Sequence, residues 1–150
     1  MSKSIYEYQQ SLEEKVEQRT KELNIKNEEL FKLSITDKLT GLYNRVKLDS
    51  VLQENMSLSL RYGNIFSVII IDIDFFKKIN DNFGHQVGDD VLKECSYILS
   101  QNIRNVDTLG RWGGEEFLVV CPETLKDGAK DLAIKLNKAI KLHKFSTYPH

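Results

Sequence analysis

Residues 110–117 read Gly-Arg-Trp-Gly-Gly-Glu-Glu-Phe and decide the fold, because they join two apolar, strand-like segments, 106–112 and 117–121. Glycine accepts a positive φ without steric cost, so Gly113-Gly114 between two strands predicts a tight hairpin turn. Neighbouring strand side chains point to opposite faces, so Glu115 and Glu116 can share one ion only where the backbone turns sharply. The stretch therefore predicts a hairpin that presents two carboxylates beside a space for a bulky ligand.

A second acidic cluster lies in the apolar run of residues 66–76, which reads Phe-Ser-Val-Ile-Ile-Ile-Asp-Ile-Asp-Phe-Phe. A β-branched run of this kind predicts a strand buried on both faces, with Asp72 and Asp74 on one face. Phe75 and Phe76 are expected to pack in the core and the pocket floor. Buried carboxylates are costly unless they are solvated or paired with a cation, and solvated acids at a strand end remain the simpler alternative.

The two acidic clusters together predict a metal site if the strands that carry them are neighbours. Like charges about 4 Å apart repel by roughly 4 kcal/mol at an effective dielectric of 20, so such a group needs a counter-ion. Oxygen-only ligands suit Mg²⁺ or Mn²⁺. Magnesium keeps part of its coordination shell for water and phosphate oxygens, so the pattern indicates phosphoryl or nucleotidyl transfer.

Three amphipathic segments predict helices whose apolar stripes pack in the core. They span roughly residues 44–62, 88–103 and 124–142, and Gly63 is expected to end the first of them. Their apolar residues include Val46, Leu48, Val51, Leu52, Leu60, Val91, Leu92, Cys95, Ile98, Leu99, Leu125, Ala129, Leu132, Ala133, Leu136, Ala139 and Ile140. The order helix, strand, helix, hairpin, helix predicts an α+β fold with helices packed on a mostly antiparallel sheet.

The amino-terminal segment predicts a coiled coil. Ser4 to Leu33 contains no glycine or proline, and Ile5, Leu12, Val16, Leu23, Leu30 and Leu33 follow a repeat close to seven residues. Arg19 and Lys26 occupy positions where leucine is expected, so the coil should be weak, and a weak coil can switch register. The predicted domains are therefore a dimerisation or signalling helix, 1–34, and a globular domain, 35–150.

Composition limits the classes of partner and compartment. The chain has 150 residues, 41% of them hydrophobic, and a net charge of −1, which gives no basic excess for nucleic-acid binding. Cys95 and Cys121 are expected to be buried free thiols in a reducing compartment. No signal peptide or membrane span is visible, so we expect a cytoplasmic domain without direct membrane contact, within a parent protein that could be anchored to the inner membrane.

Four motifs in order resemble the GGDEF domain of diguanylate cyclases. They are Asp37-Lys-Leu-Thr-Gly-Leu-Tyr-Asn-Arg45, Asp72-Ile-Asp-Phe-Phe-Lys-Lys-Ile-Asn80 with Gly84-His85, Gly88-Asp89, and residues 111–117. The resemblance implies a ferredoxin-like, nucleotide-cyclase-like βαββαβ sheet with packed helices. It also implies condensation of two GTP molecules into cyclic di-GMP and pyrophosphate, with each subunit of a homodimer presenting one GTP. The family normally continues with a further strand pair and a terminal helix, so we expect a carboxyl-terminally incomplete domain that is weakly active, inactive or strand-swapped.

The resemblance also assigns roles to individual residues. Asp72 and Glu115 resemble the metal carboxylates, helped by the Ile73 carbonyl, and Glu116 resembles a further metal ligand or the base near the attacking hydroxyl. Asn80 and Asp89 match the guanine-binding residues, whose amide and carboxylate suit the edge of that base. Lys77 matches a phosphate contact, with a solvated helix lysine as the alternative.

Arg104 and Asp107 match the RxxD motif through which cyclic di-GMP inhibits many members of the family. There the arginine and the aspartate grip the guanine of the product, and an arginine fork suits guanine O6 and N7. A surface ion pair is the simpler alternative.

Two further functions stay open beside the metal-dependent cyclase. One is a cyclic di-GMP receptor without catalysis, which would bind through Arg104 and Asp107. The other is a dimerisation module that binds no nucleotide.

Overall fold

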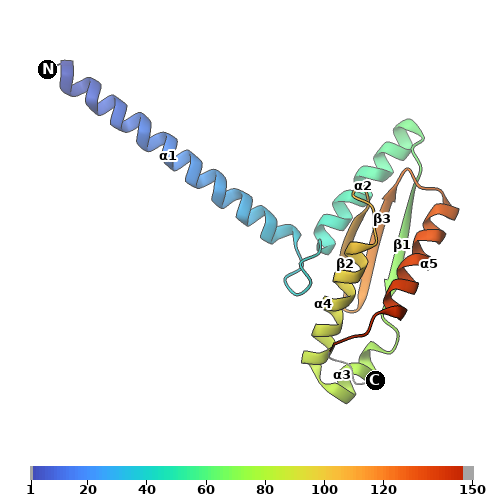
Figure 1. Cartoon of the computed structure of the whole chain (residues 1–150). Coiled ribbons are helices and arrows are strands. Elements are labelled where there is room, and N and C mark those ends of the chain that lie inside the picture. The colour runs from blue at the N-terminus through green and yellow to red at the C-terminus, as the bar shows by residue number, and fades with distance from the viewer. Residues whose placement is uncertain (1, 147–150) are drawn as a thin grey trace. The chain divides into compact units, whose positions relative to one another are not determined.

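A computed structural model describes residues 2–146 of the chain. The chain divides into two compact units, Met1–Ser34 and Ile35–His150 (Figure 1). Residues 147–150, the end of the predicted second domain, lie outside the described residues.

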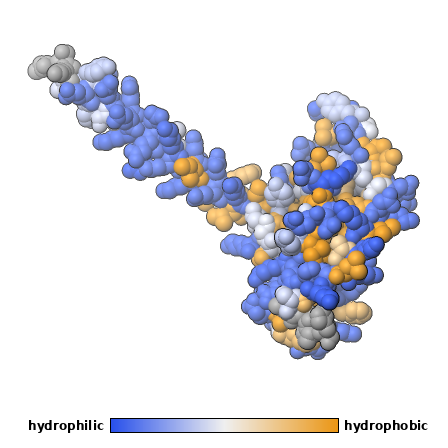
Figure 2. All heavy atoms as spheres, in the orientation of Figure 1, coloured by the Kyte–Doolittle hydropathy of each residue, from blue (hydrophilic) through white to orange (hydrophobic). Residues whose placement is uncertain are grey.

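Helix α1, Ser2–Ile35, makes up the first unit. Every described side chain from Ser4 to Ser34 is exposed, including Val16 at 58% and Leu23 at 59%. Figure 2 shows a largely hydrophilic helix, with hydrophobic residues visible toward its carboxyl-terminal half. A long helix gains most of its stability in proteins from packing an apolar face, so this stripe calls for a partner. The long helix is confirmed, and its pairing stays a prediction.

The second unit is an α+β fold, as predicted. Its elements are α2 (Arg45–Tyr62), β1 (Phe66–Asp72), α3 (Phe76–Phe83), α4 (His85–Gln101), β2 (Thr108–Gly113), β3 (Glu116–Pro122) and α5 (Lys126–Leu142). The strands form one antiparallel sheet in the order β1-β3-β2 (Figure 1). The described residues thus provide βαββα of the expected βαββαβ core.

The central strand is β3, and its alternate residues face two different parts of the core. Phe117, Val119 and Cys121 join the larger cluster, which also contains buried residues of α4 and α5. Leu118 and Val120 pack with Leu48 and Val51 of α2 on the opposite face. The sheet therefore lies between α2 on one side and the α4–α5 pair on the other.

The prediction that the 66–76 run is a strand buried on both faces is wrong. Strand β1 hydrogen-bonds only to β3 among the described residues, and Ile70 remains 68% exposed. Helix α2 packs on β2 and β3 and reaches β1 only at Phe66, so Val68 and Ile70 on the same face of β1 stay exposed. The same apolar composition therefore gives an edge strand here, and β3 takes the central place.

Strand β1 also ends earlier than predicted, at Asp72. Asp74 lies in the turn that follows, so it does not share a strand face with Asp72. Phe75 is 72% exposed with a positive φ of 58°, whereas Phe76 begins α3 and is buried. The expectation of a core position holds for Phe76 and is wrong for Phe75, because the left-handed turn at Phe75 redirects the chain.

The amphipathic helices form, but three stripe residues are exposed rather than in the core: Val46, Leu60 and Leu125. At about 100° per residue, Val46 lies about 200° and Leu60 about 120° around the α2 axis from the buried Leu48. Leu125 precedes α5 in an extended conformation. By contrast, Cys95 and Cys121 are buried free thiols as expected, and burial raises the pKa of Cys95 to about 12 and that of Cys121 to about 11.

Candidate functional site

The β2–β3 hairpin turns one residue later than the sequence predicts. Gly113 pairs with Glu116, so the two turn residues are Gly114 and Glu115. Gly114 has a φ of 47° and Glu115 has no positive φ, the pattern of a two-residue turn with glycine first. A register shift between Arg111 and Gly113 places a bulge at Trp112, and this extra residue moves the turn.

The β1–β3 register brings two acidic side chains together. Asp72, the last residue of β1, pairs directly with Glu116, the first residue of β3. Side chains of directly opposed residues project to the same face with Cβ atoms about 5 Å apart. Both residues are exposed, and neither forms a hydrogen bond or ion pair within residues 2–146. Two facing carboxylates without a counter-charge form a place where a cation is favourable.

The third predicted metal residue is less closely placed. Glu115 is half-buried in the turn, next to Glu116, and no group of three His, Cys, Asp or Glu side chains in the described part of the chain is arranged to hold a metal ion. Magnesium is commonly held by one or two carboxylates together with water and substrate phosphates. The Asp72–Glu116 pair and the Ile73 carbonyl fit such an open site, whereas a closed three-carboxylate cage does not form.

The two predicted guanine-binding residues lie at the α3–α4 junction. The Oδ1 atom of Asn80 on α3 is buried and has no hydrogen-bond partner within residues 2–146. A Cβ atom on Gly88 would overlap this oxygen and lie 3.2 Å from the Phe76 ring, so only glycine leaves room for it. Asp89 follows Gly88 on α4 and is half-buried. A buried acceptor without a donor is costly, and a ligand N–H would satisfy it.

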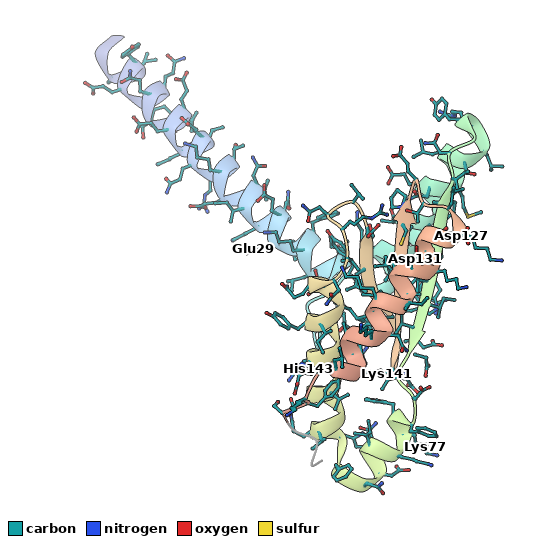
Figure 3. The ribbon with its side chains drawn as sticks, turned by 45° about the vertical axis from the view of Figure 1, so that its right-hand side comes forward. Glu29, Lys77, Asp127, Asp131, Lys141 and His143 are labelled. Carbon is teal, nitrogen blue, oxygen red and sulfur yellow. The ribbon has the colours of Figure 1, made fainter. Side chains whose placement is uncertain are left out.

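Lys77 lies on α3, three residues before Asn80, and a cavity that neither Asn80 nor Asp89 lines lies against β1. Figure 3 shows Lys77 projecting from α3, where the side chain is exposed. A cavity of about 570 Å³ lies between β1 and the helices α4 and α5, and is lined mostly by aliphatic side chains, with Asp72 and Asp74 among them. Asn80, Asp89, Glu115 and Glu116 do not line it, so the candidate site is an open surface at the ends of strands and helices.

Two residues that sequence reasoning did not assign connect the hairpin to the segment after α1. The Arg111 Nε atom donates to the Gly114 carbonyl at 2.8 Å, and Nη1 lies 3.4 Å from an Asp37 carboxylate oxygen. Burial by itself raises the pKa of Asp37, but hydrogen bonds from Thr40 and the Arg111 charge hold that pKa below its ordinary value. Asp37 and Arg111 belong to the first and the last of the four sequence motifs, and this was the signal by which the sequence could have indicated a role for them.

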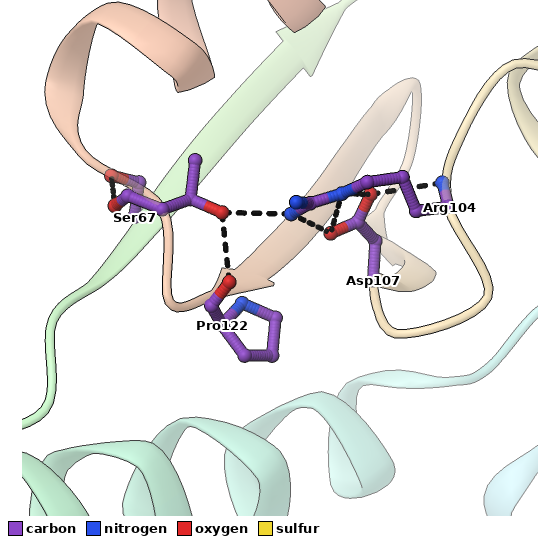
Figure 4. Close-up of polar contacts among 5 residues, drawn as sticks. Ser67, Arg104, Asp107 and Pro122 are labelled. Atoms are coloured by element: carbon purple, nitrogen blue, oxygen red, sulfur yellow. Dashed lines mark hydrogen bonds and ion pairs between the residues drawn. The ribbon is translucent and has the colours of Figure 1, made fainter.

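The RxxD residues form a closed network at the opposite end of the β1–β3 pair (Figure 4). Arg104 Nη2 donates to Asp107 Oδ1 and to Thr124 Oγ1, both at 2.7 Å, and Nε donates to both Asp107 oxygens at 3.2 and 3.1 Å. The Asp107 side chain is 0% exposed and that of Arg104 is 53% exposed. These hydrogen bonds raise the pKa of Arg104.

The network continues into the sheet. Thr124 Oγ1 donates to the Pro122 carbonyl at 2.8 Å, and Ser67 Oγ donates to the Thr124 carbonyl at 2.7 Å. Three segments far apart in sequence thus meet here: the α4–β2 loop, the start of β1 and the β3–α5 loop. An exposed surface ion pair, the alternative considered for Arg104 and Asp107, does not describe a fully buried carboxylate.

Comparison with known proteins identifies the family of the globular unit. Residues 34–148 match the family described as "Diguanylate cyclase, GGDEF domain". The chain belongs to the GGDEF family. Its GGDEF domain is 44% identical over 112 residues to the response regulator PleD of Caulobacter vibrioides, which covers 74% of this chain and 24% of PleD. Diguanylate cyclase DgcP of Pseudomonas aeruginosa is 39% identical over 134 residues, covering 87% of this chain and 20% of DgcP. The chain thus spans a quarter or less of these two relatives.

Solved structures show the same architecture. The crystal structure of the coiled coil and GGDEF domain of DgcB from Caulobacter crescentus in complex with c-di-GMP matches with a TM-score of 0.77 and 27% identity, covering 84% of this chain and 68% of that one. Diguanylate cyclase SiaD from Pseudomonas aeruginosa, in complex with its activator SiaC, matches with a TM-score of 0.72 and 35% identity, covering 91% and 54%. A long helix before a GGDEF domain is therefore an arrangement that a solved relative shares.

Proposed function

We propose that the GGDEF domain is the catalytic part of a diguanylate cyclase that condenses two GTP molecules into cyclic di-GMP and two pyrophosphates. The observation that carries this proposal is the direct pairing of Asp72 with Glu116 beside the Gly114-Glu115 turn. Unpartnered facing carboxylates have no structural purpose that offsets their repulsion, but they suit a cation that carries a triphosphate. Relatives named diguanylate cyclases support the same reaction.

Asp72, Glu116 and the Ile73 carbonyl would hold Mg²⁺ or Mn²⁺, and Glu115 would become a further ligand if the turn brings its carboxylate toward the ion. The metal, when bound, would neutralise the triphosphate and stabilise the charge that develops as pyrophosphate leaves. Glu116 would alternatively act as the base that accepts the proton of an attacking 3′ hydroxyl. Lys77 would contribute a cation for the phosphates if its flexible side chain turns toward them.

Asn80 and Asp89 would select guanine. The Asn80 amide offers an acceptor and donors for the guanine edge, and the Asp89 carboxylate accepts from the N1 and N2 groups. The unpartnered Asn80 Oδ1 beside Gly88 supports this assignment, because a bound base would supply the missing donor.

One site holds one GTP, so closing a cyclic dinucleotide requires two domains that face each other. We propose that α1 supplies the dimer contact as a parallel coiled coil along the stripe of Val16, Leu23 and Leu30. The apolar residues are more than half exposed in the single chain, and burying them would stabilise a dimer.

The Arg104–Asp107 network is the proposed product site, through which cyclic di-GMP inhibits the enzyme. A half-exposed guanidinium held by a buried carboxylate is a preorganised binding group, because its orientation is fixed before the ligand arrives. The same observation favours the second candidate function, a cyclic di-GMP receptor without catalysis.

The experiment that separates these functions is GTP turnover with Mg²⁺, with the product identified by chromatography. The cyclase proposal predicts cyclic di-GMP from the parent chain and none from Glu116→Gln, with Asp74→Asn as an acidic control of parental activity. Absence of product from the parent, with cyclic di-GMP binding that is lost on Arg104→Ala, would instead establish the receptor.

The dimer is tested separately by sedimentation of the Leu23→Asp, Leu30→Asp double variant. We expect monomers, because two charges in the seam cannot be buried. Ile25→Asp is the matched control, since Ile25 is 57% exposed but lies off the repeat. Dimers of unchanged stability in the double variant would exclude the coiled-coil contact.

A further inference from the structure

The hydrogen bonds of Arg104 leave its guanidinium incompletely available to a ligand. The group has five N–H donors. Nε and one Nη2 hydrogen are directed to Asp107, and the other Nη2 hydrogen is directed to Thr124 Oγ1 at 2.7 Å. Nη1 has no partner within residues 2–146. The guanidinium has two edges that could each offer a ligand two neighbouring N–H donors. The Nε–Nη2 edge is fully occupied, and the Nη1–Nη2 edge is partly occupied.

Recognition of guanine by arginine uses two neighbouring donors for O6 and N7. Asp107 occupies the fork formed by Nε and Nη2, and its side chain is fully buried. The second fork, formed by Nη1 and Nη2, lacks its Nη2 hydrogen because Thr124 accepts it. In this arrangement a guanine can take hydrogen bonds from Nη1 alone.

Thr124 is fixed in this blocking position. Its hydroxyl hydrogen is donated to the Pro122 carbonyl at 2.8 Å, so the oxygen is left as an acceptor for Arg104. Its carbonyl accepts from Ser67, and the residue is only 8% exposed. The loop therefore holds the threonine oxygen against the guanidinium before any ligand arrives.

We propose that Thr124 competes with the bound guanine for Arg104 Nη2 and thereby sets a reduced affinity at the product site. This inference rests on the proposed binding of cyclic di-GMP at Arg104. Asp107 holds the Nε edge of Arg104 in this arrangement, and Thr124 takes the remaining Nη2 hydrogen. Removing the threonine hydroxyl completes the outer fork and strengthens binding, which is the opposite of what loss of an ordinary supporting residue does.

The test measures binding of cyclic di-GMP by titration calorimetry to the full chain and its variants. Thr124→Val retains the shape without the hydroxyl, and we expect about three- to tenfold tighter binding, the net worth of one ordinary hydrogen bond. Thr124→Ser keeps the oxygen and should bind like the parent. Ser67→Ala removes the neighbouring bond at the Thr124 carbonyl and should also bind like the parent, which controls for loop disturbance.

Equal or weaker binding by Thr124→Val, with parental binding by Thr124→Ser, would overturn the competition. Thr124→Ala is also expected to bind cyclic di-GMP more tightly than the parent. It replaces Thr124→Val in the test if thermal melting shows that the valine variant is unfolded. Absence of cyclic di-GMP binding by the parent chain overturns both the competition and the product site. Binding by the parent that is lost in Arg104→Ala keeps the product site whatever the threonine variants do, so the two failures are distinguishable.

Discussion

The two ends of the β1–β3 pair carry charged clusters of opposite character. At one end, Asp72 faces Glu116 with no counter-charge and no hydrogen bond within residues 2–146. At the other end, where Phe66 pairs with Pro122, the Asp107 carboxylate is fully buried and accepts hydrogen bonds from both the side chain and the backbone N–H of Arg104. One end of the β1–β3 pair, the open end, therefore has unpaired charges. The other, the closed end, has charges that are paired within the chain.

The difference teaches how a single pair of strands can keep its candidate catalytic carboxylates at one end and a buried ion pair that stabilises the fold at the other. Facing like charges weaken a sheet, so the open end is tolerated only where something outside the chain completes it. A buried carboxylate is tolerated only when it is fully satisfied from within the chain, as Asp107 is. Substitutions at the open end should therefore change activity, and substitutions at the closed end should change stability.

The largest effect is expected at the open end. Asp72→Asn should lower GTP turnover at least about 100-fold, because a metal carboxylate is lost. The same variant should raise the free energy of unfolding by about 0.5 kcal/mol, since it removes one of two facing like charges. Turnover assays and urea denaturation measure the two effects, with Asp74→Asn as the control. A loss of activity that is accompanied by unfolding would contradict the separation of roles.

The closed end should give the reverse result. Asp107→Asn should lower the free energy of unfolding by about 1–3 kcal/mol, because a buried carboxylate that accepts from Arg104 and from the backbone loses its charge. Urea denaturation is the measurement, and Asp131→Asn, an exposed acid on α5, is the matched control. Stability equal to that of the control would show that the buried pair contributes nothing to the fold.

Gly88→Ala tests a position that should affect both ligand binding and core packing. The added methyl group would overlap Asn80 Oδ1, so we expect about tenfold weaker binding of GTP and about 1–2 kcal/mol lower stability. Fluorescence titration with a GTP analogue and thermal melting measure these changes. Gly128→Ala on α5, where the nearest atom is 3.3 Å away, is the helical control and should leave GTP binding unchanged. Parental GTP binding by Gly88→Ala would remove Asn80 from the proposed guanine site.

The smallest effect concerns pH and the Arg111–Asp37 contact. The pKa of Asp37 is lower in the folded chain than its ordinary value of 3.8, so its contribution to stability is present above that value. The contribution is lost as the pH falls through the folded pKa. Asp37→Asn should therefore flatten the stability profile below about pH 4, by about 1 kcal/mol or less. Parallel melting of parent and variant from pH 3 to pH 6 provides the comparison, and identical profiles would mean that Asp37 does not stabilise the fold.

Local sequence patterns were sufficient for the type of each main element. Alternating and β-branched runs predicted β1 and the hairpin, and helical periodicity predicted α1, α2, α4 and α5. The short helix α3 and the exact end of β1 were missed, because a left-handed turn at Phe75 separates them and a bulky residue rarely adopts that conformation. The turn position was missed because the bulge at Trp112 depends on the pairing partner.

The sequence by itself determined the α+β class, the family and the acidic residues of the candidate site, since these depend on residue type and local spacing. Only the tertiary structure decided that β3 is central, that Asp72 faces Glu116, and that Asn80 Oδ1 is buried without a partner. The structure alone also joined Arg104 to Thr124, 20 residues later, and Asp37 to Arg111, 74 residues later. The physical reason is that strand order, register and contacts between distant segments follow from how the layers pack, which no local pattern encodes.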